Sequence, residues 1–385
     1  MEMNKELGQI IHEEGGLFTL NNTYDQSVIF FFETLSARFN RNLEFAKSIY
    51  IIKPLPINYV FINSMQINAF AYTTSTTEAS QFDFIAINAG VPFALLNIFL
   101  RMLSHPNLFI DIGNPDKEKL SDNNFQEIEE ILFNPDHISL IPKCKIRELY
   151  AHELALCALD FIFCHELAHL HRGHCNYDRQ YFQKLYISEA FETPNDFFDS
   201  LFTSQCMELD ADIIGIRFTY RLMSKIGLNF KNIPIPTKEP GTSLYSAMHA
   251  IYAEPEKAFR ALSISTYTFF RIFAGHWSPE KQIDKKHPNP EIRMLTIFEP
   301  FMPNGVQPDI TVEKFNLSLA VNMSAAEECI AAIQGKDIDL RPIHNIFTLQ
   351  EHGFDNYINE LFSKRNDLIP KLKLYMRGDY LYGKS

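Results

Sequence analysis

Several features that mark large protein classes are missing from this sequence. Its 385 residues include only six cysteines, and these form neither a CxxC pair nor the spacing of a disulfide framework. In such a chain, free thiols in a reducing compartment are the default expectation. We therefore expect a cytoplasmic protein with unpaired cysteines.

The sequence also has no block of lysine or arginine and no long uninterrupted apolar run. Its net charge is −12, so we expect neither nucleic acid nor an anionic membrane surface as its main partner. The first residues lack the basic start and apolar core of a secretory signal, and the apolar stretch 86–103 is broken by Asn88, Gly90 and Pro92. We therefore expect no signal peptide and no integral membrane span. Nothing in the sequence indicates an oligomeric state.

Apolar and aromatic residues, by contrast, are plentiful. Hydrophobic residues make up 46% of the chain, 34 residues are phenylalanine, and only 21% are charged, which is typical of a globular protein. A chain of this length buries a core large enough for one big domain or two. Long helical stretches and two β-like runs, 59–72 and 82–88, predict a predominantly helical α+β fold in which the runs form a hairpin.

The segment 154–174 combines a core helix with residues that bind metals. Leu154–Cys164 carries a single charge, Asp160, and is followed directly by His165, Glu166 and His169 in an HExxH pattern. The apolar run predicts a helix through the middle of a domain. Side chains four residues apart share a helical face, so both histidines can offer a nitrogen to one metal ion. Glu166 lies beside them, where it can take a proton from water, as in zinc hydrolases.

A catalytic zinc ion usually has three protein ligands and an open position, so a third ligand must be found. The metzincin pattern HExxHxxGxxH is excluded, because this chain has Arg172 and Cys175 at the last two positions of that pattern. His171 and His174 are close in sequence, but neither has the spacing of a ligand on the same helical face. Gly173 predicts the end of the helix instead.

Glu208 is the better candidate, because it lies in a later stretch that predicts a separate long helix. Asp212 follows four residues later on the same face, which suits a carboxylate that holds the N–H of His165 or His169 and fixes its orientation. A solvated acidic helix face is the alternative interpretation, and it is credible for Asp210. It is weaker for Glu208 and Asp212, because apolar residues follow directly.

Three motifs follow one another in a set order: HELAHLHRGH at 165–174, ELDADIIG at 208–215 and HPNPEIR at 287–293. They resemble the gluzincin zinc metallopeptidases of the HtpX and CAAX-prenyl-endopeptidase type. The patterns of those peptidases are HExxH, ExxxD and a His-Pro element with an arginine six residues after the histidine. A more distant similarity, through HExxH alone, is to the Lit-type phage-exclusion peptidases.

The resemblance implies a gluzincin-like zinc peptidase core with a small β-hairpin or sheet beside the active-site helix. It implies one zinc ion as cofactor, bound by His165, His169 and Glu208. In the same way it implies that Glu166 is the general base and that Asp212 holds a ligand histidine in place.

The resemblance also extends to residues on either side of the zinc ligands. It implies that His287 and Arg293 are catalytic residues, which would lie near the metal and steady the tetrahedral intermediate or the carboxylates of the site. A histidine in a surface loop is the alternative for His287. An Asn-Ala-Phe-Ala sequence resembles a strand of that family and would form an edge strand on which an extended peptide pairs. Its residues are Asn68, Ala69, Phe70 and Ala71.

The predicted organisation is a metallopeptidase domain over residues 1–300, with its core motifs at 68–293 and a polar insertion at 104–145, and a helical C-terminal extension over 301–385. The predicted function is that of a soluble zinc-dependent endopeptidase acting on a protein or peptide. Two alternatives stay open: a catalytically silent or autoinhibited gluzincin-fold binding protein with a structural zinc ion, and a metal-dependent hydrolase of other substrates. The presence of Glu166 beside the ligands favours an active enzyme, because a silent site does not need a general base.

Overall fold

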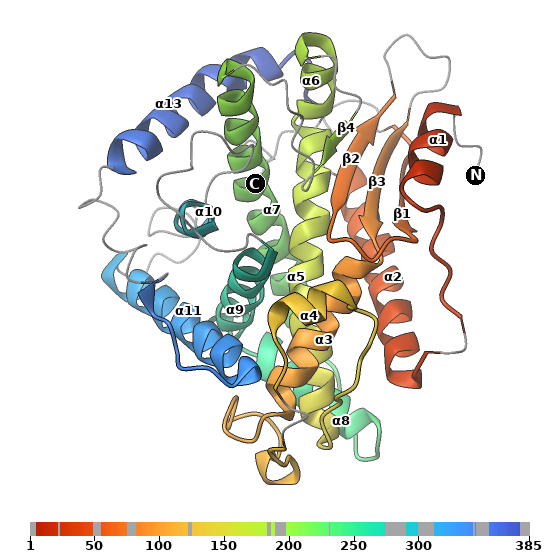
Figure 1. Cartoon of the computed structure of the whole chain (residues 1–385), viewed down its shortest axis with the longest axis vertical. Coiled ribbons are helices and arrows are strands. Elements are labelled where there is room, and N and C mark those ends of the chain that lie inside the picture. The colour runs from red at the N-terminus through yellow and green to blue at the C-terminus, as the bar shows by residue number, and fades with distance from the viewer. Residues whose placement is uncertain are drawn as a thin grey trace.

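Helix α5 (Lys145–His171) runs through the middle of the molecule, with a sheet on one side and helix α7 (Phe198–Phe230) on the other (Figure 1). The predicted core helix is confirmed, but it begins well before the apolar run, and all its side chains from Arg147 onward are buried. Within the described chain, α5 is the one helix long and apolar enough to cross a membrane. Its apolar window is wholly buried inside the protein, as in the core helix of a globular protein.

This computed structural model describes residues 5–21, 24–48, 55–74, 82–121, 125–182, 186–188, 198–230, 232–273, 290–298, 312–341, 343 and 354–377. Besides α5 and α7, its α-helices are α1 (Lys5–Glu13), α2 (Gln26–Lys47), α3 (Gly90–Ser104), α4 (Ile128–Phe133), α6 (His174–Phe182), α8 (Gly241–Tyr252), α9 (Pro255–Phe273), α10 (Pro290–Ile297), α11 (Val312–Gln334) and α13 (Phe354–Leu372). A short 3₁₀ helix, η1, spans Pro115–Lys117.

The sheet beside α5 has four strands in the order β1-β3-β2-β4. β2 (Ala69–Thr73) and β3 (Asp83–Asn88) pair antiparallel, which confirms the predicted hairpin. β1 (Ile57–Ile62) pairs parallel with β3 on its other side. The run 59–72, predicted as a single strand, is therefore two strands, because residues 63–68 carry the chain from one edge of β3 to the other.

The fourth strand, β4 (Tyr186–Ser188), comes from much later in the chain and pairs antiparallel with β2. This corrects one prediction, since β2 is an inner strand of the described sheet and its residues do not form a free edge. The predicted edge strand comprised Asn68, Ala69, Phe70 and Ala71. Of these, Phe70 and Ala71 pair with Ser188 and Ile187 of β4, and Asn68 directly precedes β2. An unpaired strand edge presents N–H and C=O groups that any extended segment can satisfy, and nothing local in the sequence identifies which segment does so.

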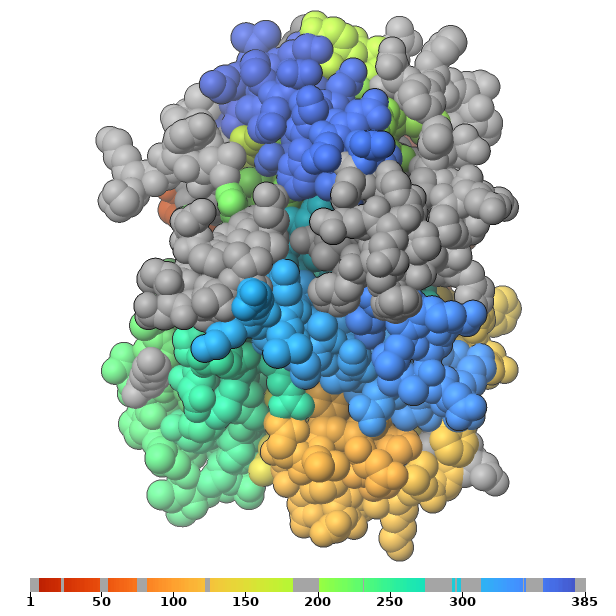
Figure 2. All heavy atoms as spheres, turned by 90° about the vertical axis from the view of Figure 1, so that its left-hand side faces the viewer, coloured from red at the N-terminus to blue at the C-terminus, as the bar shows by residue number. Residues whose placement is uncertain are grey.

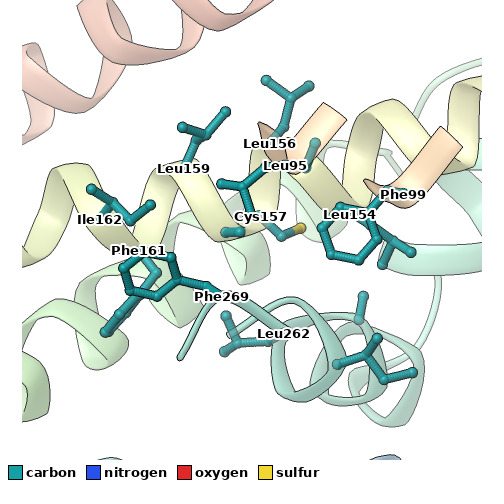
Figure 3. Packing of buried hydrophobic residues seen from close by; sticks show 14 of the residues in the cluster. Leu95, Phe99, Leu154, Leu156, Cys157, Leu159, Phe161, Ile162, Leu262 and Phe269 are labelled. Carbon is teal, nitrogen blue, oxygen red and sulfur yellow. The ribbon is translucent and has the colours of Figure 1, made fainter. Parts of the chain in front are cut away.

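Apolar side chains from helices α3 and α9 fix the position of α5. Figure 3 shows Leu95 and Phe99 of α3, and Leu262 and Phe269 of α9, packed against the apolar residues of α5. The rings of Phe161 and Phe269 lie 6.1 Å apart between centroids. Each fully buried side chain of this kind contributes about 1.5–3 kcal/mol, so α5 is held firmly in place along its length.

Asp160, the one charge in the apolar run of α5, has a buried partner. Arg38 of α2 donates from its Nε to Asp160 Oδ2 at 2.7 Å and from its Nη1 to Glu153 at 2.9 Å. Arg38 also donates to the hydroxyl of Tyr252. Because buried charges are costly unless they are paired and hydrogen-bonded, this cluster explains why α5 tolerates a carboxylate at its centre.

Another buried arginine anchors the described part of segment 104–145. Arg147, at the start of α5, is fully buried and donates five hydrogen bonds of 2.7–3.0 Å to backbone carbonyl oxygens. The acceptors belong to Leu103, His105, Leu108, Phe109 and Ile112. The first part of the predicted polar insertion at 104–145 is thus bound to a buried side chain of α5.

The C-terminal helix α13 packs against α7, and α11 packs against α9. Figure 2 shows both α13 and α11 on one face of the molecule, seen from the left-hand side of Figure 1. Beyond α13, the backbone N–H of Arg377 donates to His171 O at 2.8 Å, and its side chain contacts Asp83 and Thr73. The C-terminal part therefore contacts both the end of α5 and the sheet. The domain boundary at residue 300 stays a prediction.

Candidate metal centre

His165 and His169 lie one turn apart on α5, as their spacing predicts, and their rings meet edge to face with 4.7 Å between centroids. Their Nε2 atoms are 3.0 Å apart, and both residues are buried. Gly173, with a φ of +77°, lies two residues after His171, the last residue of α5. This left-handed conformation is readily adopted by glycine and ends the helix where the sequence predicted.

Glu208 of α7 completes the group. Its Oε2 lies 3.2 Å from His165 Nε2 and 3.7 Å from His169 Nε2. The three donor atoms all lie within 4.8 Å of one another, and all three residues are buried. The residues predicted as metal ligands are therefore brought together by two different helices.

A close crossing of α5 and α7 sets this geometry. Glu208, Asp212 and Gly215 follow a spacing of four and then three residues, so they line one face of α7. A Cβ atom on Gly215 would lie 3.0 Å from both the Cα and the N of His165. Glycine at this position therefore lets α7 approach the backbone of α5 closely enough for Glu208 to reach both imidazoles.

The donor set fits a divalent metal ion such as zinc. Burial lowers the pKa of His169 to about 4, although the Glu208 carboxylate acts to raise it, so the ring is neutral at pH 7. A neutral imidazole has one nitrogen lone pair to offer. Two nitrogens bound to a tetrahedral zinc ion at about 2.0–2.1 Å lie roughly 3.3 Å apart, close to the spacing seen between the two Nε2 atoms.

Asp212 and Arg293 lie behind His165. The Nδ1 of His165 is 2.9 Å from Asp212 Oδ1, which favours an Nδ1–H tautomer that leaves the lone pair on Nε2. Arg293 donates to both oxygens of Asp212, from Nε at 2.7 Å and from Nη2 at 2.8 Å. Its guanidinium also lies 4.4 Å from the ring centroid of Phe270. Arg293 thus contacts the carboxylate that orients a ligand, and His287 lies outside the described residues.

Glu166 is buried on the turn of α5 that carries both histidines. Burial raises the pKa of the Cys175 thiol, and the nearby carboxylates of Asp83, Asp178 and Glu166 raise it further. The Sγ of Cys175 lies 3.7 Å from the carbonyl oxygen of Ala71 in β2. Glu166 follows His165 directly, about 100° further round the helix, so it lies beside the metal-binding face of α5.

Two residues near the site were missed or misinterpreted from the sequence. Asp210, for which a solvated acidic face was a credible alternative, is only 1% exposed and pairs with Arg172 at 2.6 Å. His174, which has the wrong spacing for a ligand, lies with its Nδ1 3.0 Å from His169 Nδ1. The turn at Gly173 folds His174 back toward α5, and helical periodicity alone does not predict this.

Comparison with known proteins identifies one matching family model. Residues 116–218 match the model of the family Peptidase U49, whose members are hydrolases that act on peptide bonds. The matched segment contains HExxH, Glu208 and Asp212. This is the Lit-type family to which the sequence shows the more distant similarity, and the resemblance to the HtpX type stays a prediction. Neither the curated proteins nor the solved structures gave a match.

Proposed function

We propose that this chain, which matches a peptidase family over residues 116–218, is a zinc-dependent endopeptidase that cleaves a protein or peptide substrate. The observation that carries the proposal is the buried convergence of His165, His169 and Glu208 directly beside Glu166. We also propose a cytoplasmic location, because all six cysteines are free.

Each residue of the centre has a distinct role in this proposal. His165, His169 and Glu208 hold the metal through two nitrogen lone pairs and one carboxylate oxygen. When bound, a zinc ion supplies a Lewis acid for the scissile carbonyl and lowers the pKa of a water molecule. Glu166 accepts the proton from that water and passes it to the leaving amine. From the resemblance alone, we propose that His287 assists in binding the oxyanion.

Asp212 and Arg293 support the ligands without touching the substrate. The Asp212 carboxylate fixes the ring of His165, and the two hydrogen bonds from Arg293 hold that carboxylate in place. Arg293 also offsets the negative charge of Asp212 in a buried environment, where an unpaired carboxylate would be costly.

The metal centre predicts a clear result for a Glu208→Ala variant. The purified wild-type protein should contain about one zinc ion per chain, and the variant should bind zinc at least about a hundredfold more weakly, since it loses a direct ligand. Zinc content and chelator competition measure this, with the exposed Glu256→Ala on α9 as the matched control.

In a peptide-library digest, a chelator should stop cleavage and added zinc should restore it. A wild-type protein that neither binds zinc nor cleaves peptides would contradict the proposal.

One observation favours an autoinhibited form of this enzyme as the second candidate. β4 pairs antiparallel with β2, which packs against α5. An extended peptide substrate adds to a sheet edge through the same backbone groups. While β4 is in place, a substrate strand has no access to β2, so displacement of β4 would have to precede binding at that edge.

A double substitution in β4 tests this second candidate. Successive N–H groups along a strand point to opposite sides, so replacing both Tyr186 and Ile187 by proline removes at least one N–H directed at β2. Loss of one such hydrogen bond, worth about 1 kcal/mol, should raise the rate of peptide cleavage about fivefold. The matched control replaces the same two residues by alanine, which keeps both N–H groups. An unchanged or lower rate in the proline variant would show that β4 does not restrain the site.

A further inference from the structure

The two imidazoles of the metal centre have different partners behind them. His165 Nδ1 faces the carboxylate of Asp212 at 2.9 Å. His169 Nδ1 instead faces another imidazole, that of His174, at 3.0 Å between the two Nδ1 atoms. All three histidines are buried. A carboxylate can only accept a hydrogen bond, whereas a neutral imidazole can donate or accept, so the role of His174 depends on its own partner.

That partner is Asp210. The Nε2 of His174 lies 3.3 Å from Asp210 Oδ2. Because a carboxylate is an acceptor, the proton of a neutral His174 is favoured on Nε2, which leaves the Nδ1 lone pair facing His169. His169 then donates its Nδ1–H to His174 and keeps the lone pair of Nε2 for the group formed with His165 and Glu208. This order of donors and acceptors sets the tautomer that a metal ligand requires.

Two arginines donate hydrogen bonds to the carboxylate of Asp210. Arg172 donates from Nε at 2.6 Å, and Arg365 donates from Nε at 2.9 Å. Arg365 belongs to α13, the helix that packs on α7 near the C-terminal end of the chain.

We propose that Arg365, Asp210 and His174 form a positioning chain for His169, so that α13 contributes directly to metal affinity. This inference rests on the proposed metal centre, because it assigns the residues that orient one of its ligands. None of the three touches the metal or the substrate, and they act only through the ring of His169. The centre is thereby oriented from two sides, through Asp212 for His165 and through Asp210 for His169.

Zinc affinity, measured by competition with a chromogenic chelator, tests the proposal. His174→Leu removes the acceptor and should weaken zinc binding by about 10–100-fold, the range found for residues that orient metal ligands. His174→Asn places an acceptor oxygen close to the position of imidazole Nδ1 and should restore most of the affinity. A role in packing alone would not separate these two variants in this order, because asparagine fills the buried space less well than leucine.

A second variant, far from the metal ligands in sequence, guards against a folding defect in the first. Arg365→Met should also lower the zinc affinity. Lys371→Met, on the exposed face of the same helix, likewise removes one positive charge but should leave the zinc affinity unchanged. Denaturant unfolding of each variant without metal shows whether it is folded. The cobalt-substituted proteins provide a separate readout, because a misoriented His169 changes the visible spectrum.

The outcomes distinguish the two proposals. If the wild-type protein binds no zinc, the proposed function fails. If the wild type binds zinc but His174→Leu and Arg365→Met bind it within threefold of the Lys371→Met control, the positioning chain is overturned and the metal centre stands.

Discussion

Replacing Glu166 by glutamine is expected to lower kcat for peptide cleavage by about a thousandfold while zinc content stays at the wild-type level. General base catalysis commonly contributes 10²–10⁴ in rate. Glutamine keeps the size of the side chain but cannot accept the proton from water. Because Glu166 is not among the three residues that form the metal group, its replacement should leave that group intact. Steady-state kinetics and metal analysis of the same preparation measure both quantities.

The matched control for this variant is Glu256→Gln, an identical change at an exposed position on α9. It should have wild-type activity and wild-type zinc content. If Glu166→Gln cleaves at the wild-type rate, Glu166 is not the general base. If the variant loses zinc, Glu166 contributes to metal binding, and its assignment as a base that is not needed for metal binding is wrong.

The second large effect concerns stability, at the opposite end of α5. Replacing Arg147 by methionine is expected to destabilise the protein by about 3–5 kcal/mol, because a buried polar group left without its partner costs about 1–3 kcal/mol and a broken buried network costs more than one such group. The substitution removes the donors of five backbone carbonyl oxygens at once. Denaturant unfolding followed by circular dichroism measures the change.

Arg147→Lys separates charge from hydrogen bonding in this network. Lysine keeps the positive charge but has at most three donors on a single nitrogen, so the loss of stability should lie between zero and that of Arg147→Met. Zinc affinity should stay unchanged in the folded fraction, because Arg147 and His165 are separated by roughly 27 Å of helix. If Arg147→Met unfolds at the same denaturant concentration as the wild type, water replaces the guanidinium at little cost and the network does not hold the 104–112 segment.

The sequence alone determined the parts of the site that depend on local helical geometry. His165 and His169 share a face because they are four residues apart, and Glu208 and Asp212 share a face for the same reason. The apolar run before His165 predicted a buried helix, and Gly173 predicted its end. The HPNPEIR motif predicted a role for Arg293 near the metal, and in the structure Arg293 donates two hydrogen bonds to Asp212.

Only the tertiary structure decided which distant segments complete these elements. β4 pairs with the side of β2 that the sequence assigned to a substrate. Arg147 binds the carbonyl oxygens of the predicted polar insertion, and Arg365 donates to Asp210, 155 positions away in the sequence. Backbone edges and buried charges need partners, but many segments can satisfy the same chemical need. Periodicity specifies which residues of one helix share a face, whereas the partner of that face depends on how the whole chain packs.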